Sequence, residues 1–225
     1  MPADRATVLV LGASGLVGRH VLEQLLSDPR VGRVVAPGRR PLGRVDARLH
    51  APVVDFDALP EAADWWAVDS VICALGTTMR QAGSRDAFCR VDHDYPLAFA
   101  GLARRHGARA FALTSAMGAN RRSRFFYNRV KGALEAALQA QAWPSLTLVR
   151  PGLVGGARAE MRPGERAAAM ALGALAPLLP RRWRISPAPR IAAALVASVL
   201  MPAPGCRVID AASLAAPAST DSSDR

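Results

Sequence analysis

Three residues near the middle of the chain carry side chains suited to proton transfer. Tyr127 and Lys131 lie four positions apart in residues 126–140, where apolar side chains recur every four positions and predict an amphipathic helix. The two side chains therefore project from one helix face, about one turn apart. A lysine ammonium stabilises a neighbouring phenolate, as a tyrosine that exchanges protons near neutral pH requires. Ser115 follows a predicted strand, residues 109–114, from which its hydroxyl could reach the same reacting oxygen.

The elements that must position these residues begin near the N-terminus with a strand, a turn and a helix. Residues 7–18 read T-V-L-V-L-G-A-S-G-L-V-G, and a helix is predicted over residues 16–26. This order is the context in which a glycine motif binds a dinucleotide. Gly12 allows the tight turn, Gly15 lets the backbone approach a pyrophosphate, and Gly18 lets the helix pack closely on the strand. The spacing differs by one residue from the common G-x-G-x-x-G pattern.

The second predicted strand, residues 31–36, ends before two arginines. An acidic side chain at this place binds the adenosine ribose of NAD, whereas arginine accommodates the 2′-phosphate of NADP. The chain has no acidic residue between Asp28 and Asp46, while Arg39 and Arg40 stand where the phosphate would lie. Because guanidinium groups bind phosphate through paired hydrogen bonds, the pattern favours NADP(H) over NAD(H).

Each of these patterns also has an ordinary alternative. A lysine that follows a tyrosine on a surface helix would show the same spacing as Tyr127 and Lys131. A strand–turn–helix with incidental glycines would resemble the dinucleotide motif, and two surface arginines in a turn would resemble Arg39 and Arg40. The motifs gain weight from their order along one chain, with the tyrosine and lysine between two strands downstream of the glycines.

The remaining pattern alternates strands with helices and predicts an α/β fold, a doubly wound and mostly parallel sheet of the Rossmann type. Asp55 follows the third strand, where it either lines an adenine pocket or caps the next helix. Leu75 and Gly76 end the fourth strand, at the sheet edge where ligands bind. Residues 1–152 are expected to form the dinucleotide-binding core. Residues 153–214 are expected to form a small, mostly helical substrate-side segment integrated with it, and residues 215–225 a disordered tail. The remaining predicted strands cover residues 49–54, 70–75, 146–149 and 206–209, and the remaining helices residues 60–67, 84–106, 165–179 and 191–200.

Composition narrows the class of protein further. With 225 residues, 51% of them hydrophobic, the chain can build one sizeable core. It has no recognisable signal peptide, and its longest apolar stretch, residues 167–179, is too short to span a bilayer. Three scattered cysteines without metal-ligand spacing predict a reducing, cytoplasmic location. The consecutive Asp92, His93 and Asp94 cannot all face one ion from a helix, so no metal site is expected.

The net charge of +11 comes almost entirely from arginine, since Lys131 is the single lysine. A positive field attracts anionic partners, including a phosphorylated dinucleotide. The arginine clusters carry no interleaved aromatics and match no DNA-reading motif, so nucleic-acid binding is not expected. A genome that encodes most surface cations as arginine accounts for most of the clusters.

With these motifs in view, the chain resembles the short-chain dehydrogenase/reductase superfamily. It is most similar to its atypical members, the Tat-interacting-protein-type oxidoreductases and NAD(P)H-binding epimerase-like proteins. The resemblance covers nearly the whole chain. It rests on G-A-S-G-L-V-G, C-A-L-G-T-T, F-F-Y-N-R-V-K-G, R-P-G-L-V-G-G, and R-P-G-E at residues 162–165.

The resemblance implies an NADP(H)-dependent oxidoreductase that moves a hydride between nicotinamide and a carbonyl or alcohol. Tyr127 would be the general acid/base, Lys131 would tune it and bond the nicotinamide ribose, and Ser115 would orient the substrate. The residues implied to contact the cofactor are Gly12, Ser14, Gly15, Leu16, Val17, Gly18, Arg39, Arg40, Asp55, Leu75, Gly76, Tyr127, Lys131, Pro151, Val154 and Arg162.

One position departs from this pattern. Many relatives have an asparagine in the central helix that completes a proton relay, and here the region reads Val91-Asp92-His93. An ionised aspartate cannot donate that hydrogen bond. The alternative function is therefore an NADP(H)-binding redox sensor with little or no turnover, in which arginine clusters contact a partner. Neither the substrate nor the oligomeric state follows from the sequence.

Overall fold

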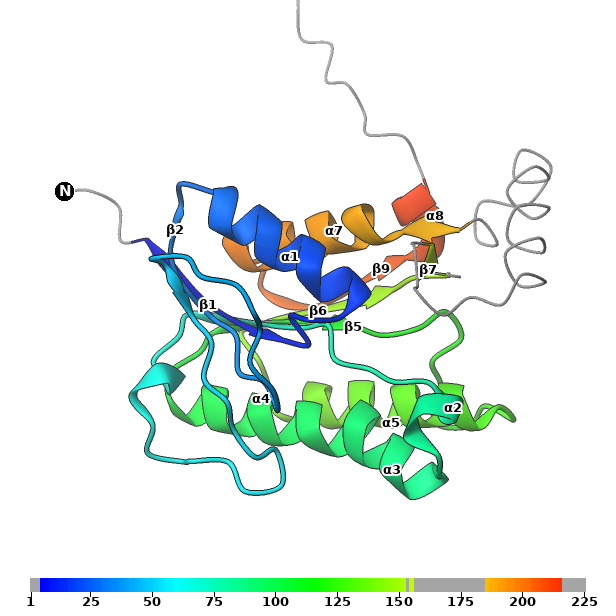
Figure 1. Ribbon diagram of the computed structural model, residues 1–225. Helices are drawn as coiled ribbons and strands as arrows, with labels where there is room; N and C mark the ends of the chain where they lie inside the picture. The colour runs from blue at the N-terminus through cyan, green and yellow to red at the C-terminus, as the bar shows by residue number, and fades with distance from the viewer. Residues whose placement is uncertain (1–4, 153, 156–184, 216–225) are drawn as a thin grey trace, which may run out of the picture.

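A seven-stranded parallel sheet organises the part of the chain that the structure describes, and β7 and β8 form a separate two-stranded sheet. The computed structural model describes residues 5–152, 154–155 and 185–215. Across these residues seven strands pair in the order β3-β2-β1-β4-β5-β6-β9, and every pairing is parallel (Figure 1). This arrangement confirms the predicted doubly wound α/β fold. The strands are Ala6–Leu11 (β1), Val31–Val35 (β2), Leu49–His50 (β3), Ser70–Cys73 (β4), Ala110–Thr114 (β5), Ser145–Arg150 (β6) and Gly205–Asp210 (β9).

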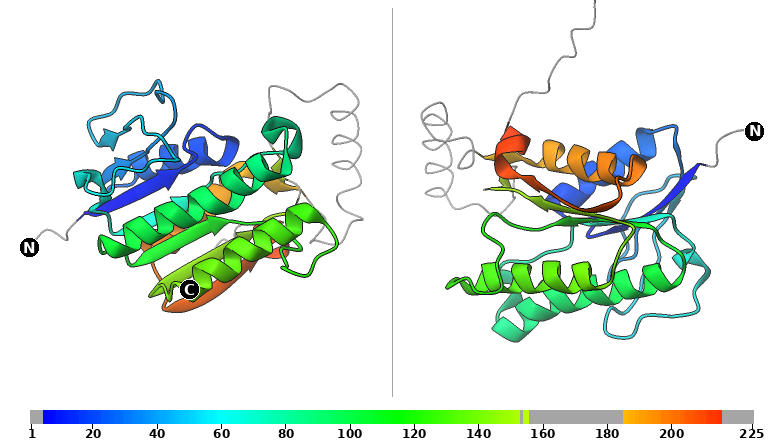
Figure 2. Two further views of the ribbon diagram at one scale, coloured as in Figure 1. Left: turned by 90° about the horizontal axis from the view of Figure 1, so that it is seen from below. Right: turned by 180° about the vertical axis from the view of Figure 1, so that it is seen from behind.

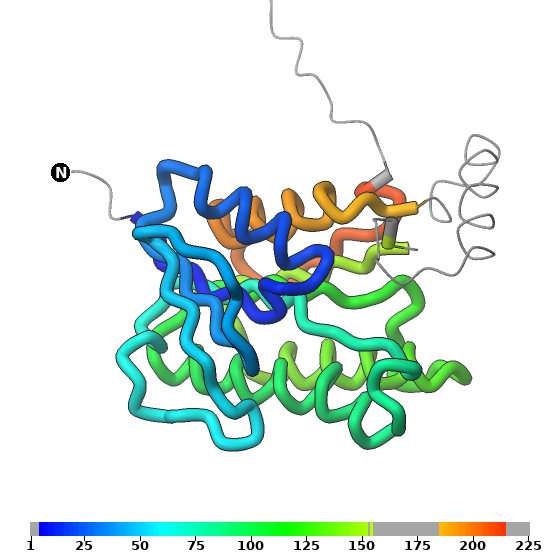
Figure 3. The backbone as a smooth tube through the Cα atoms, viewed as in Figure 1, coloured from blue at the N-terminus to red at the C-terminus, as the bar shows by residue number. Residues whose placement is uncertain are grey.

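Helices cover both faces of the sheet. Figure 1 and the two views of Figure 2 show α1 and α7 on one face and α3, α4 and α5 on the other. Figure 3 shows that α7, which is late in the chain, runs beside the early helix α1. The longer helices are Leu16–Ser27 (α1), Tyr95–Arg105 (α4), Phe126–Ala140 (α5) and Ala188–Leu200 (α7). The short elements are Asp64–Trp66 (η1), Met79–Ala82 (α2), Arg85–Cys89 (α3), Arg90–Asp94 (η2), Val154–Gly155 (β7), Ser186–Pro187 (β8) and Ala211–Ala215 (α8).

The central strands are mostly apolar, as expected for parallel strands buried on both sides. Side chains alternate between the two faces of β1. Val8 and Val10 join the hydrophobic cluster beneath α1 and α7, whereas Leu9 and Leu11 join the cluster beneath α4 and α5. All four side chains are fully buried. The first strand thus anchors the whole core and fixes the position of the turn that follows it.

Three predicted elements differ from the structure. The third strand is shorter than residues 49–54, because Pro52 has no N–H to donate and only an isolated bridge from Val53 to Gly38 continues the pairing. The helix expected over residues 60–67 is the single 3-10 turn η1. The helix expected over residues 84–106 is divided into α3, the π-helical turn η2 and α4.

The C-terminal part completes the sheet. The late strand predicted over residues 206–209 is β9, which pairs with β6 at the sheet edge. Ala215, expected in the tail, is the last residue of α8, and residues 216–225 lie outside the described residues. The helix predicted over residues 165–179 lies outside them as well. In the part of the chain that the structure describes, no helix is long and apolar enough to cross a bilayer.

Candidate functional site

The turn after β1 is built by glycine. Gly12 has a φ of +77°, in the left-handed region, and its carbonyl accepts the Gly15 N–H at 2.9 Å. A Cβ on Gly12 would lie 2.7 Å from the carbonyl oxygen of Ala74, just after β4. A Cβ on Gly18 would collide with the Gly12 carbonyl itself. Neither Gly12 nor Gly18 therefore has room for a side chain, as expected for a tight turn and for close packing of the helix on the strand.

The N-terminus of α1 offers free main-chain donors. Gly15 is the N-cap residue and makes no side-chain cap, and the first turn holds no acidic residue. Ser14 and Gly15 are exposed, while Val17 lies in the hydrophobic core. Unpaired amides at the positive end of the helix dipole, beside bare glycine backbone, fit a pyrophosphate. Val17 and Gly18 help to shape this cradle by packing.

The predicted phosphate-binding arginines follow β2. Arg39 and Arg40 are both exposed, and the Arg39 guanidinium lies 5.9 Å from the ring centre of Phe56. Asp55 is exposed and accepts the Asp57 N–H at 2.9 Å, so its carboxylate stabilises the local turn. Asp55 therefore does not cap the next helical element, because η1 begins only at Asp64 and has Ala63 as its N-cap.

The predicted catalytic pair, Tyr127 and Lys131, lies near the N-terminus of helix α5. Tyr127 lies in its first turn, is 41% exposed, and packs edge-on against Phe88 at 5.8 Å between ring centres. Lys131, one turn later, is buried, and its Nζ lies 2.8 Å from Oδ1 of Asp92. The phenol therefore faces solvent while the ammonium is held inside the protein.

Asp92 joins the lysine to the loop after β4. Its second oxygen, Oδ2, accepts the Thr77 N–H at 2.7 Å. A Cβ on Gly76 would lie 3.3 Å from Asp92 Oδ1 and 3.8 Å from Lys131 Nζ, so a bare backbone passes beside the pair. Burial alone would lower the pKa of Lys131, but the Asp92 carboxylate and the Tyr127 phenol raise that pKa above its ordinary value.

A buried thiol interacts electrostatically with both members of this ion pair. Cys73 is the last residue of β4 and is fully buried, and this burial raises the pKa of its thiol to about 11. The thiol is therefore protonated at neutral pH and acts as a small apolar group in the core.

Ser115 has a partner that the sequence motifs did not indicate. Its hydroxyl donates to Oε1 of Glu135 at 2.5 Å, and both residues are buried. The same carboxylate accepts Arg150 Nε at 2.9 Å and Arg150 Nη2, and this hydrogen bonding raises the pKa of Arg150. The Ser115 proton is thus committed, and its oxygen remains an acceptor.

The segment after β6 borders the same end of the sheet. Pro151 is buried, and its carbonyl accepts the Met117 N–H at 2.9 Å, two residues beyond Ser115. Val154 lies in β7, which pairs with β8. Arg162, implied to contact the cofactor, lies outside the described residues.

Most of the predicted site residues that the structure describes fall into three groups, two that are connected and a third that is separate. The first group is the glycine turn with Leu75, and the second is the Tyr127 helix with Gly76 and Asp92. Arg39 and Arg40 stand apart, after β2. Sequence reasoning gave no role to three residues of the site, Thr77 and Arg150, which lie inside quoted motifs, and Glu135, which lies outside them. Glu135 follows Lys131 by four positions, so helical spacing alone could have pointed to it.

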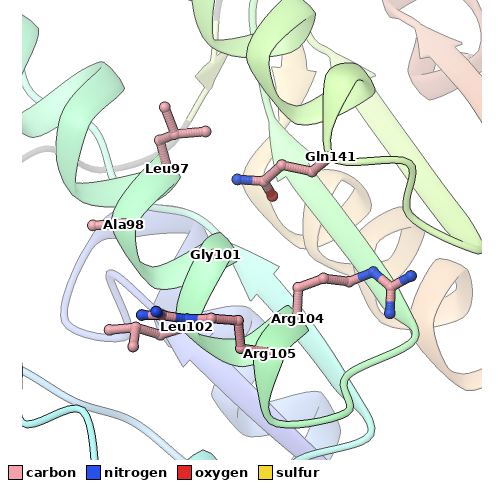
Figure 4. Close-up of a pocket in the computed structure, with 7 residues that line it drawn as sticks. All are labelled: Leu97, Ala98, Gly101, Leu102, Arg104, Arg105 and Gln141. Atoms are coloured by element: carbon pink, nitrogen blue, oxygen red, sulfur yellow. The ribbon is translucent and has the colours of Figure 1, made fainter.

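A hollow of about 430 Å³ lies elsewhere, on the outer side of α4 and beyond the C-terminal end of α5 (Figure 4). Gln141, which lines it, follows the end of α5 opposite to Tyr127. This hollow is therefore separate from the glycine turn and the lysine pair. Among the described residues, no three acidic, histidine or cysteine side chains are grouped so that they could hold a metal ion.

Comparison with known proteins places the chain in a family. Residues 8–164 match the model of the "NAD dependent epimerase/dehydratase family". The chain belongs to this family. The match includes the glycine turn, Asp92, Ser115, Tyr127 and Lys131, and it confirms the resemblance drawn from the sequence motifs.

Two relatives are similar to this chain over most of its length. Protein HTATIP2 of Rattus norvegicus is 39% identical over 173 residues, which cover 75% of this chain and 71% of the relative. Protein fmp52, mitochondrial, of Emericella nidulans is 34% identical over 177 residues, which cover 76% of each protein.

Solved structures of low identity support the fold. MoeE5 in complex with UDP-glucose and NAD has a TM-score of 0.67 at 19% identity, over 90% of this chain and 74% of that one. WbmG of Bordetella bronchiseptica in complex with NAD has a TM-score of 0.68 at 15% identity, and the match covers 93% of this chain and 74% of WbmG. The chain is thus a Rossmann-fold member of a family named for NAD dependence.

The prediction of a cytoplasmic location was wrong by this comparison, since several fungal relatives carry names that call them mitochondrial. The physical reason is that free thiols indicate a reducing compartment without identifying which one. The three cysteines are indeed free, with Cys73 buried and Cys206 exposed.

Proposed function

We propose that this protein is an NADP(H)-dependent oxidoreductase acting on a carbonyl or alcohol carbon. The observation that carries the proposal is the contrast within one face of α5. Tyr127 is open to solvent, and Lys131, one turn away, is buried and ion-paired. A buried ammonium next to an accessible phenol is an arrangement that stabilises the phenolate between proton transfers.

Each residue has a defined task in the proposed mechanism. The amides at the start of α1 would hold the pyrophosphate, and a bound dinucleotide would supply or accept the hydride. Tyr127 gives the proton from its hydroxyl to the substrate oxygen during reduction and takes it back during oxidation. Lys131 keeps a positive charge near that hydroxyl. Ser115, whose own proton goes to Glu135, accepts a hydrogen bond from the tyrosine or from an alcohol substrate.

The preference for NADP(H) is supported by Arg39 and Arg40, which are exposed after β2 where an acidic residue would favour NAD. We expect NADPH to bind at least tenfold more tightly than NADH in a fluorescence titration. Replacing both arginines with serine should remove this preference. Arg33→Ser, an exposed arginine inside β2, is the matched control and should leave the ratio unchanged.

The catalytic role is tested by following NADPH oxidation across a panel of aldehydes, ketones and quinones. Tyr127→Phe should lower kcat by about 10³-fold or more while NADPH still binds, because one general acid contributes on the order of 10²–10⁴. Retained turnover in Tyr127→Phe would refute the assignment of the proton donor.

A second candidate is a redox sensor that binds NADP(H) without turnover. The hydrogen bond from Ser115 to Glu135 favours it, because the serine proton is not available to a carbonyl substrate. Tight NADPH binding by the wild-type chain without oxidation by any member of the panel would support the sensor. In either case the ligand is a small anionic molecule, and nucleic-acid binding is not part of the proposal.

A further inference from the structure

The proposed mechanism uses Lys131 but gives no task to Asp92, a fully enclosed carboxylate in the middle of a helical segment. Burying a charged group is costly unless it is paired. Both Asp92 oxygens have partners, the Lys131 ammonium at 2.8 Å and the Thr77 N–H at 2.7 Å. The carboxylate thus bridges α5 and the loop after β4.

We infer that Asp92 is a positioning residue that fixes the catalytic ammonium of Lys131 in place and keeps it charged. The inference rests on the proposed function for the role of Lys131 in proton transfer. Many similar proteins have an asparagine in this region that completes a proton relay. Asp92 instead binds the lysine side chain directly.

The local backbone explains how Asp92 reaches inward. In a regular α-helix, the N–H of residue 96 would bond to the Asp92 carbonyl, but Pro96 has no N–H and its ring crowds that oxygen. The chain widens here into the π turn η2, in which the Tyr95 N–H bonds to the Arg90 carbonyl five residues back. Within this turn the Asp92 side chain is 1% exposed, whereas that of Asp94 is 61% exposed.

The charge of Asp92, and not only its shape, matches its surroundings. Its two partners are both donors, an ammonium and a backbone amide. An asparagine would turn an NH₂ group toward one of them and lose a hydrogen bond. The other titratable groups facing Lys131 are the Tyr127 phenol on its own helix and the Cys73 thiol on β4, and burial raises the pKa of that thiol, so Asp92 is the carboxylate in this set.

The single lysine of the chain makes a direct test practical. Labelling the full-length protein with ¹³C,¹⁵N-lysine gives one side-chain signal set, from Lys131, whose Cε and Hε shifts report the charge on Nζ. In the wild-type chain we expect no titration below pH 10.5, the ordinary value for lysine. In Asp92→Asn the midpoint should fall by about one pH unit or more, because burial then acts without an opposing carboxylate.

Asp94→Asn is the matched control, since it removes the same charge two residues away from an exposed side chain paired with His93. It should leave the Lys131 titration unchanged. An unchanged midpoint in Asp92→Asn, or an equal shift in Asp94→Asn, would overturn the inference. Should Asp92→Asn fail to fold, the double variant with Lys131→Met should fold again, because neither charge is then left alone. Failure of that rescue would contradict the pairing.

The titration also separates this inference from the proposed function. A wild-type chain that binds no NADPH, yet shows the expected Lys131 shift in Asp92→Asn, would refute the function and support the pairing. A chain that binds and oxidises NADPH while Asp92→Asn leaves the lysine signal unchanged would support the function and refute the positioning role.

Discussion

Two regions at one end of the sheet achieve their shape by opposite means. The glycine turn between β1 and α1 is made of main chain, and it depends on side chains that are missing at Gly12, Gly15 and Gly18. The region around Lys131 is made of buried charges, and it depends on side chains brought together from η2 and α5. The first region can be damaged by adding a single methyl group, and the second by removing a single charge.

The difference lies in how each region is stabilised. The turn contributes unpaired amides that stay accessible at the helix N-terminus. The lysine region pairs its two charges with each other, because an unpaired charge in the core is strongly unfavourable. The accessible donors suit the binding of an anion, and the enclosed pair suits the constant orientation of one ammonium.

The largest effect on stability is expected from breaking the buried ion pair. Lys131→Met leaves Asp92 buried without its cation and should lower the free energy of unfolding by about 4 kcal/mol. Urea denaturation measures this change. The double variant with Asp92→Asn should recover much of the loss, since both charges are then absent. Strictly additive losses in the double variant would show that the two residues do not interact.

Adding a side chain in the glycine turn should lower the free energy of unfolding by slightly less. Gly12→Ala places a Cβ 2.7 Å from the Ala74 carbonyl at a positive φ, and we expect a loss of about 3 kcal/mol together with loss of nucleotide binding. Gly43→Ala is the matched control, because Gly43 has a φ of +68° but nothing within 4 Å of the added Cβ. It should cost only about 1 kcal/mol. Equal losses in the two variants would mean that the close approach to Ala74 is unimportant.

A third change tests whether the buried charges extend to Glu135. Glu135→Gln weakens its bonds with Ser115 and with Arg150, which is about one-third exposed, and should lower the unfolding free energy by about 2 kcal/mol. Glu23→Gln, an exposed partner of His20, should change it by less than about 0.5 kcal/mol. A loss in Glu135→Gln as small as that in Glu23→Gln would limit the charged region to Lys131 and Asp92.

The smallest effect is a change in the slope of stability against pH. The pKa of Lys131 is raised in the folded state, so its contribution is fully present below the unfolded value of 10.5 and is lost as the pH rises through the folded value. The free energy of unfolding, measured by urea denaturation between pH 8 and pH 11, should therefore fall more steeply for the wild-type chain than for the Asp92→Asn, Lys131→Met double variant. Burial is the main cause of the raised pKa values of Cys73 and Tyr95, and both residues are present in both proteins. Parallel curves would contradict the raised pKa of Lys131. Gly12→Ala should shift the wild-type curve without changing its slope.

The two regions also differ in how far the sequence predicts them. Glycine spacing after an apolar run is local, so the turn and the strand β1 follow from residues 7–18 alone. The spacing of Tyr127 and Lys131 is equally local. The contact between Lys131 and Asp92 joins residues 39 positions apart and depends on a π turn caused by Pro96. The same holds for Ser115 and Glu135, whose pairing requires the packing of α5 on the sheet. Contacts that form only through tertiary structure leave no local spacing pattern in the sequence from which they could be predicted.

The thiol of Cys73 has a consequence for a protein in a redox family. With a pKa of about 11, only about one molecule in 10⁴ carries the thiolate at pH 7. Oxidants and alkylating reagents attack the thiolate, so this sulfur will be inert although it interacts electrostatically with the lysine. Cys206 on the outermost strand, which is exposed, is the natural attachment point for a fluorescent label or a surface tether that leaves the interior untouched.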